Sequence, residues 1–177
     1  MKSNKVFVSE IINMWKTKDS PDFRYYGKFD REDTTEPFWV EGGSFRTLFT
    51  RLDIARTLEL ACGIGRHSAR IVDCTDQLYM LDTSVDALEV VKQRFAQYRN
   101  VTILLSTDGE TIPALDGSLT AVFSYDAMVH FEATTVASYL AETARVLSPG
   151  GGHCFTTLYM IETRLAISVT ILDGATS

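Results

Sequence analysis

The chain is poor in cysteine, and the few that it has follow no metal-binding pattern. There are three, Cys62, Cys74 and Cys154, an odd number whose spacing is not that of metal ligands. We therefore expect no metal site, and we expect Cys62 to be a small packed residue rather than a nucleophile. Unpaired cysteines are typical of a reducing compartment, so the sequence predicts a cytoplasmic protein.

Basic residues and long apolar runs are also scarce. Lysine and arginine number 17 against 23 acidic residues, which gives a net charge of −6. Nucleic-acid binding needs clustered positive charge, so no nucleic-acid partner is expected. No apolar run approaches membrane length, and the start of the chain lacks a signal-peptide core, so no membrane partner is expected either. The 177 residues are enough for one domain with a hydrophobic core.

One stretch, residues 58–69, has the pattern of a buried strand, a tight glycine turn and the start of a helix. Gly63 and Gly65 supply backbone freedom and let a ligand approach the main chain. Ser68 is small, as packing of the helix against the strand requires. A Gly-x-Gly alone is weak evidence, because many ordinary strand-to-helix turns contain one. Its position between an apolar strand and a helix favours a ligand-binding turn.

Carboxylates accompany three successive predicted strands. Glu59 lies inside the first strand, Asp82 ends the second, and Asp108 follows the third. Parallel strands end at the same edge of a sheet, where such sheets bind ligands. An acid after the second strand suits ribose hydroxyls, whereas three acids would repel a pyrophosphate. This chemistry favours a cofactor with an ammonium and a sulfonium and no phosphate, which is S-adenosylmethionine.

At this point the sequence resembles the class I S-adenosylmethionine-dependent methyltransferases, over roughly residues 38 to 152. Residues 59–65 resemble the family's first motif, Asp82 its ribose-binding acid, and Asp108 with Gly109 its adenine-side pair. Residues 115–124 and 144–151 resemble the fourth strand with its lead-in and the helix-to-turn segment before the fifth strand. The resemblance implies these cofactor-binding residues: Glu59, Ala61, Cys62, Gly63, Gly65, Arg66, Asp82, Thr83, Asp108, Gly109 and Tyr125.

Ala61 departs from the pattern, because the family usually has its first glycine there. Alanine is small, so we expect a slightly tighter approach of the cofactor and no loss of binding.

The alternation of strands and helices predicts an α/β fold, a Rossmann-like, doubly wound and mostly parallel sheet. We expect a single domain over residues 1–177, made of an N-terminal helical or lid segment (1–52), a cofactor-binding core (53–160) and an atypical tail (161–177). The predicted helices are 4–18, one with Ser44 as its N-cap, 66–72, about 84–98 and about 134–147. The predicted inward-facing residues of the last two are Val85, Leu88, Val91, Phe95, Val136, Tyr139, Leu140 and Val146.

Residues 23–37 are polar, aromatic and irregular. They could form a lid over the cofactor cleft or a plain surface arm, and the sequence does not choose between the two. Phe38 and Trp39 either close on the methionyl end of the cofactor or staple the helix that follows.

The candidate catalytic residues are Asp126 and His130, just past the fourth strand. Methyl transfer is an in-line displacement, so the protein mainly holds two reactants in line and excludes water. A general base is needed only where the acceptor must lose a proton. His130 titrates near neutral pH, and Asp126 would lie one turn away on a helix. The alternative is that His130 caps or packs locally.

The predicted function is methyl transfer to a small-molecule substrate, whose acceptor atom stays open. One alternative is a non-catalytic adenosyl-binding module that supports a partner subunit. A nicotinamide-dependent oxidoreductase is a weaker alternative, because Glu59 and Asp108 disfavour a pyrophosphate and no Tyr-x-x-x-Lys pair follows the fourth strand.

The tail departs from the family. Residues 149–152 predict a helix stop and residues 153–160 a fifth strand, after which residues 167–172 could form one short strand. About two dozen residues follow Gly152, too few for a crossover helix and both remaining strands. We therefore expect strands six and seven to be missing or incomplete, and a homodimer through the uncovered edge. The tail is either a naturally short variant or the product of a frame change at the glycine run.

Overall fold

The computed structural model describes residues 39–156, 158–161 and 164–167. The expected helix over residues 4–18, the segment 23–37, Phe38 and nearly all of the expected strand 167–172 lie outside these residues.

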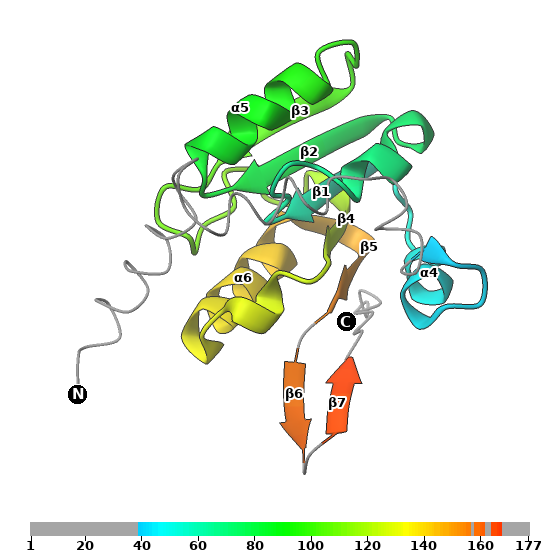
Figure 1. Ribbon diagram of the computed structural model, residues 1–177, viewed down its shortest axis with the longest axis vertical. Coiled ribbons are helices and arrows are strands. Elements are labelled where there is room, and N and C mark those ends of the chain that lie inside the picture. Colours follow the sequence, from blue (N-terminus) through cyan, green and yellow to red (C-terminus); the bar gives the residue numbers. More distant parts are fainter. Residues whose placement is uncertain (1–38, 157, 162–163, 168–177) are drawn as a thin grey trace.

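Five parallel strands form the main sheet in the order β3-β2-β1-β4-β5 (Figure 1). The chain runs outward from β1 to β3, then returns to the other side of β1 with β4. The strands are Arg56–Leu60 (β1), Gln77–Asp82 (β2), Val101–Leu105 (β3), Leu119–Ser124 (β4) and Leu147–Phe155 (β5). The reversal of strand order beside β1 creates the switch point at which open α/β sheets bind ligands.

Helices cover both faces of this sheet, which confirms the doubly wound architecture. Three α-helices of the described chain, Ser44–Phe49 (α4), Val85–Arg94 (α5) and Ala133–Val146 (α6), separate into two layers. One core cluster joins Phe49 of α4 and Val91 of α5 to one face of the sheet. A second cluster joins Tyr139 of α6 to the opposite face. Figure 1 shows α5 and α6 on their two sides.

The predicted inward faces of α5 and α6 are each wrong at one residue. Val85 is 54 % exposed and Leu140 is 41 % exposed, whereas Leu88, Val91 and Phe95 are buried as predicted. A helix turns about 100° per residue, so Val85 and Leu140 lie away from stripes whose other members face the sheet. Small or polar residues fill the stripes instead: Ala87 in α5, and Thr135 and Thr143 in α6.

Two of the predicted helix starts also differ from the structure. Gly43, and not Ser44, is the N-cap of α4, with no side-chain cap bond. Residues 66–72 form no α-helix, because two short 3-10 helices occupy this region, Ser68–Arg70 (η1) and Val72–Cys74 (η2). So short a segment recovers little helical hydrogen bonding, and 3-10 turns are the usual form of short connectors. At α5 the expected start is confirmed, since Ser84 Oγ accepts a hydrogen bond from Ala87 N.

The helix before the glycine run ends at Val146, close to the predicted end near 147, and the run itself is part of β5. β5 already begins at Leu147 and ends at Phe155, and its register against β4 shifts between Leu119 and Ala121. A Cβ on Gly151 would lie 3.0 Å from the carbonyl oxygen of Thr120. The glycine therefore permits a close approach of β5 to β4 at this irregularity.

Beyond β5, Leu158–Ile161 (β6) and Arg164–Ile167 (β7) pair antiparallel with each other (Figure 1). Within the described residues they add no strand to the five-stranded sheet. This agrees with the prediction that strands six and seven are missing or incomplete. Association through that edge stays a prediction.

Candidate functional site

Asp82 lies at the carboxyl end of β2, next to the switch point. One carboxylate oxygen, Oδ2, accepts a hydrogen bond from Gly63 N at 2.8 Å, and Oδ1 accepts one from Ser84 N at 2.8 Å. Burial raises the pKa of Asp82, and the backbone N–H donors oppose that effect. Asp82 thus connects the turn after β1 to the start of α5.

The turn after β1 uses left-handed backbone at three positions, Ala61 (φ +56°), Gly63 (φ +55°) and Gly65 (φ +77°). At Gly65 a Cβ would come within 2.5 Å of Met80 Cε and 2.7 Å of Phe95 Cε2. The space beside Gly65 is thus filled by side chains of β2 and of the residue after α5. Glycine at this position is required for packing of the turn, and its positive φ agrees with the predicted backbone freedom. Its role in ligand approach stays a prediction.

Glu59 points into the protein and holds Ser68. Its Oε2 accepts hydrogen bonds from the backbone N–H of Ser68, at 2.9 Å, and from the Ser68 hydroxyl. Ser68 is therefore a donor to Glu59 as well as a small packed residue. Burial is the largest influence on Glu59 and raises its pKa to about 8.

This protonation corrects the charge count that the sequence suggested. With a pKa of about 8, Glu59 is mostly uncharged at neutral pH. Repulsion of a pyrophosphate by three anions is therefore weaker than predicted, and it does not by itself exclude a dinucleotide. Asp108 is different, because the hydrogen bonds to its carboxylate hold its pKa well below the usual range.

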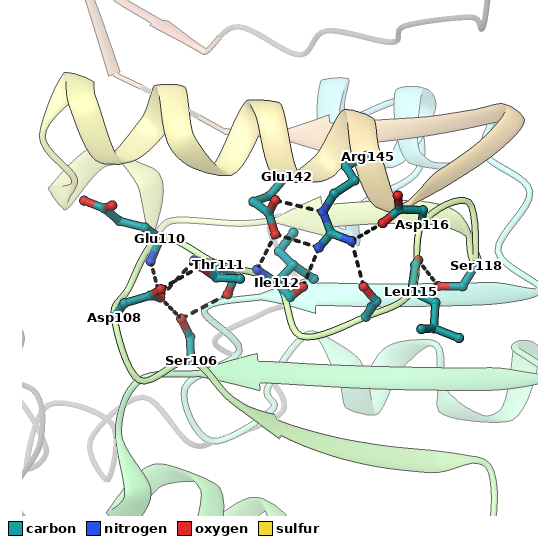
Figure 2. Close-up of polar contacts among 11 residues, drawn as sticks. Ser106, Asp108, Glu110, Thr111, Ile112, Leu115, Asp116, Ser118, Glu142 and Arg145 are labelled. Atoms are coloured by element: carbon teal, nitrogen blue, oxygen red, sulfur yellow. Dashed lines mark hydrogen bonds and ion pairs between the residues drawn. The ribbon is translucent and has the colours of Figure 1, made fainter.

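Asp108 organises the turn that follows β3 (Figure 2). Its Oδ1 accepts hydrogen bonds from Ser106 Oγ at 3.2 Å, Glu110 N at 2.9 Å and Thr111 N at 2.9 Å. Its Oδ2 accepts one from Thr111 Oγ1 at 2.6 Å. Gly109, with φ +71°, donates its N–H to Ser106 Oγ. The pair that the resemblance places beside adenine therefore lies in a tightly bonded turn.

An aromatic cluster lies between α4 and the turn after β1. Trp39 meets Phe45 and Phe49 of α4 edge-on, with ring centroids 5.2 and 5.0 Å apart. Trp39 Nε1 donates a hydrogen bond to Nδ1 of His67 at 3.0 Å. Tyr125 completes the cluster, 4.6 Å from the Phe45 ring and 4.9 Å from the His67 ring. Of its two predicted roles, Trp39 performs the stapling of α4.

The sequence did not reveal His67 as part of this cluster. His67 is 3 % exposed, and burial lowers its pKa to about 3, with smaller contributions from Arg66 and Arg70. The residues next to it in the sequence, a glycine turn and two arginines, carry no signal of this burial. Its true partner, Trp39, lies 28 residues away.

The candidate catalytic residues do not share a helical face. Asp126 has left-handed backbone (φ +58°), and only Met128–His130 form a 3-10 turn (η3). Asp126 and His130 are both exposed. The backbone N–H of Asp126 donates to Thr156 Oγ1 at 2.8 Å, which joins the ends of β4 and β5. The segment is not an α-helix, so the condition for a one-turn spacing is not met, and the role of the two residues in catalysis stays a prediction.

The remaining predicted residues border the same edge. Arg66 and Thr83 are half-buried, next to the glycine turn and Asp82 respectively. Cys62 is buried, and burial raises the pKa of its thiol well above the usual value, as suits a packed residue. In the part of the chain that the structure describes, no three His, Cys, Asp or Glu side chains gather to hold a metal ion. The described helices include none long and apolar enough to span a membrane.

A parallel sheet with a switch point, a glycine turn after β1 and an acid after β2 define a Rossmann-like ligand-binding domain. Residues 57–151, more than half of the chain, match the family described as a methyltransferase domain. The chain belongs to this methyltransferase domain family. No curated protein matches it.

Solved structures share the fold. A candidate methyltransferase from Bacillus halodurans is 22 % identical, with a TM-score of 0.58 over 68 % of this chain and 53 % of that one. A candidate S-adenosylmethionine-dependent methyltransferase from Methanococcus maripaludis is 18 % identical, with a TM-score of 0.63 over 81 % and 64 %. A 4+2 cyclase is 18 % identical, with a TM-score of 0.56 over 64 % and 43 %. The chain thus spans about half the length of the Bacillus protein.

Proposed function

We propose that this protein binds S-adenosylmethionine at the carboxyl edge of the sheet and transfers its methyl group to a small-molecule acceptor. The observation that carries the proposal is the position of Asp82, buried at the end of β2 and bonded to the glycine turn after β1, in a chain of the methyltransferase domain family. The family match supports the class of cofactor. The net charge of −6 supports a small molecule over a nucleic acid as acceptor.

The residues at this edge fit such a cofactor. A carboxylate has about four acceptor sites. The backbone N–H groups of Gly63 and Ser84 use one on each oxygen of Asp82, and the backbone N–H of Thr83 also bonds this carboxylate. Acceptor capacity therefore remains for a ribose hydroxyl. Asp108 and Gly109 would hold the adenine end, and the turn around Gly63 the methionyl end.

When bound, the cofactor supplies a methyl group that its sulfonium has already activated. The protein's own contribution is orientation and exclusion of water. Tyr125 and the aromatic rings beside it border the edge between β4 and the glycine turn, and they provide an apolar wall there. Asp126 or His130 would accept a proton only from a protic acceptor.

A second candidate is adenosyl binding without methyl transfer. The observation that favours it is the exposure of the two candidate catalytic residues, Asp126 and His130. The likeness to a 4+2 cyclase also supports this second candidate, since that protein has the same fold but is named for a different activity.

Binding titrations test the cofactor class. We expect S-adenosylmethionine and S-adenosylhomocysteine to bind and NAD⁺ to bind much more weakly or not at all. Asp82→Asn should weaken both adenosyl ligands, whereas Asp76→Asn should leave them unchanged. Asp76 is a matched control, since it is exposed and precedes β2 at the opposite end of the strand. Preferential binding of NAD⁺, or no binding of either adenosyl ligand, would overturn the proposal.

A turnover assay distinguishes a methyltransferase from a non-catalytic adenosyl-binding module. We expect S-adenosylhomocysteine to accumulate when S-adenosylmethionine is incubated with a panel of small hydroxyl, amine and carbon acceptors. Binding without any turnover across this panel would support the module instead.

A further inference from the structure

The loop that follows the Asp108–Gly109 turn is bonded to two residues of α6 (Figure 2). Glu142 and Arg145 lie three residues apart on this helix, and both point at the loop between β3 and β4. They form a bidentate pair, with Arg145 Nε 2.8 Å from Glu142 Oε1 and Arg145 Nη2 2.7 Å from Glu142 Oε2. We call this pair the α6 clamp.

Every N–H of the Arg145 guanidinium has an acceptor. Nη2 also donates to the carbonyl oxygen of Ile112 at 2.8 Å, and Nη1 donates to the carbonyl oxygen of Ala114 at 2.9 Å and to the Asp116 carboxylate. Together with the two bonds to Glu142, these contacts use all five donors of the planar fork. A lysine has three donors on one atom and cannot reproduce this arrangement.

Glu142 also accepts a hydrogen bond from the loop backbone. Its Oε2 accepts a hydrogen bond from Ile112 N at 3.0 Å, so both backbone polar groups of Ile112 are bonded to the clamp. The Ile112 side chain is fully buried in the core between the sheet and α6. The loop is thus fixed at Ile112 by its backbone and by its side chain.

This anchor lies next to the Asp108 turn. Thr111, the residue before Ile112, donates its backbone N–H and its hydroxyl to the Asp108 carboxylate. On the other side of the turn, Tyr139 Oη of α6 donates to Ser106 Oγ at 3.5 Å, and Ser106 Oγ in turn donates to Asp108. The helix therefore contacts the turn on both flanks.

We propose that Glu142 and Arg145 are positioning residues that set the Asp108–Gly109 turn for the adenine end of the cofactor. The inference rests on the proposed function, because it assumes that an adenosyl ligand occupies this edge. The clamp bonds the loop next to the turn, so it would contact neither the methyl group nor the acceptor. Its effect is on how well the site recognises the base.

The test compares Arg145→Lys and Glu142→Gln with Val146→Ala in the full chain. Val146 is a matched control, since it is fully buried on the same helix, next to Arg145, and its truncation destabilises the core without removing a clamp contact. Titrations use S-adenosylhomocysteine and S-inosylhomocysteine, which differ at the 6-position of the base. Urea unfolding gives each variant's stability, so that affinities are compared where all variants are folded.

Arg145→Lys should weaken S-adenosylhomocysteine about tenfold and reduce its preference over the inosyl ligand, because the loop loses directional hydrogen bonds. Glu142→Gln keeps an oxygen acceptor for Ile112 N and should lie between Arg145→Lys and the wild type. Val146→Ala should keep both the affinity and the preference of the wild type.

Two results would overturn the inference, and they differ from failure of the proposed function. One is that both clamp variants keep the wild-type base preference. The other is that Val146→Ala loses that preference to the same extent, which would make the effect one of stability alone. If the wild type binds neither ligand, the proposed function has failed, and the assignment of this turn to adenine falls with it. If Arg145→Lys does not fold, the base preference of Glu142→Gln is compared with that of the wild type and of Val146→Ala instead.

Discussion

The carboxylate of Asp82 bonds the backbone N–H of Gly63 at 2.8 Å, across 19 residues of sequence. A residue predicted to hold a ribose therefore also holds the turn that faces the cofactor. Substitution of Asp82 consequently affects both the ligand and the fold, and the two effects have to be measured separately.

Asp82→Ala should lower the affinity for S-adenosylhomocysteine and also the free energy of unfolding. Each hydrogen bond lost to this carboxylate costs about 1.5–3 kcal/mol, and the backbone N–H groups of Gly63 and Ser84 lose their acceptor. Calorimetric titration measures the first effect and urea unfolding the second. Unchanged affinity in a folded variant would contradict the placement of the ribose.

Gly65→Ala should destabilise the fold by about 2–4 kcal/mol, because the new Cβ meets Met80 and Phe95 in addition to the cost of a positive φ. Gly150→Ala is the control, with φ +81° and nothing within 4 Å of the added Cβ. It should cost only about 1 kcal/mol. Equal losses in urea unfolding would show that backbone conformation alone requires glycine at position 65.

Ala61→Gly should stabilise the protein slightly, by up to about 1 kcal/mol, since Ala61 has left-handed backbone (φ +56°) that glycine adopts without strain. Ala69→Gly, at an exposed position without positive φ, should instead destabilise by about 0.5–1 kcal/mol. Thermal and urea unfolding compare the two. A loss of stability in Ala61→Gly as large as in Ala69→Gly would be the contrary result.

Glu59 should make the protein less stable as the pH rises from about 4.5 to about 8. The folded pKa of about 8 exceeds the ordinary 4.5, so in this range the native state keeps a proton that the unfolded chain releases. The slope is up to about −1.4 kcal/mol per pH unit, and it levels off above the folded pKa. Glu59→Gln should remove it in urea unfolding at a series of pH values. The same slope in that variant would assign the dependence to another group.

His67 should have the opposite effect at lower pH. Its folded pKa of about 3 lies below the ordinary 6.5, so the unfolded chain binds a proton that the native state does not. Stability should therefore fall as the pH falls from 6.5 toward 3. His67→Asn, which offers an oxygen to Trp39 Nε1, should flatten this dependence. Measuring it in the Glu59→Gln background separates the two groups, whose slopes oppose each other between pH 4.5 and 6.5.

Local pattern in the sequence was enough to predict the sheet and one edge of the site. The third strand, Val101–Leu105, precedes Asp108, and Asp82 ends the second strand, both as expected. Apolar runs, glycine turns and chain direction act over short distances along the chain, and parallel strands then place their carboxyl ends together. The family resemblance depended on these same local motifs.

Helix faces and short connectors were predicted less well. Val85 and Leu140 fitted an apolar stripe but are exposed, because which face of a helix is buried depends on the angle at which it packs on the sheet. The run at residues 149–152 follows the end of α6 as predicted, but its place inside β5, where it lets the strand pass close to β4, was not predicted.

The protonation state of Glu59, the packing of Gly65 and the contacts of Arg145 were decided only by the tertiary structure. Glu59 is a charged residue by sequence, and it is burial that raises its pKa to about 8. From the sequence, Arg145 is simply a residue near the end of a helix. In the structure its guanidinium donates hydrogen bonds to a loop about 30 residues away. Sequence determines which groups the chain carries and where its strands end. Burial, clashes and long-range hydrogen bonds depend on which distant groups the fold brings together, and so they set the chemistry of this edge.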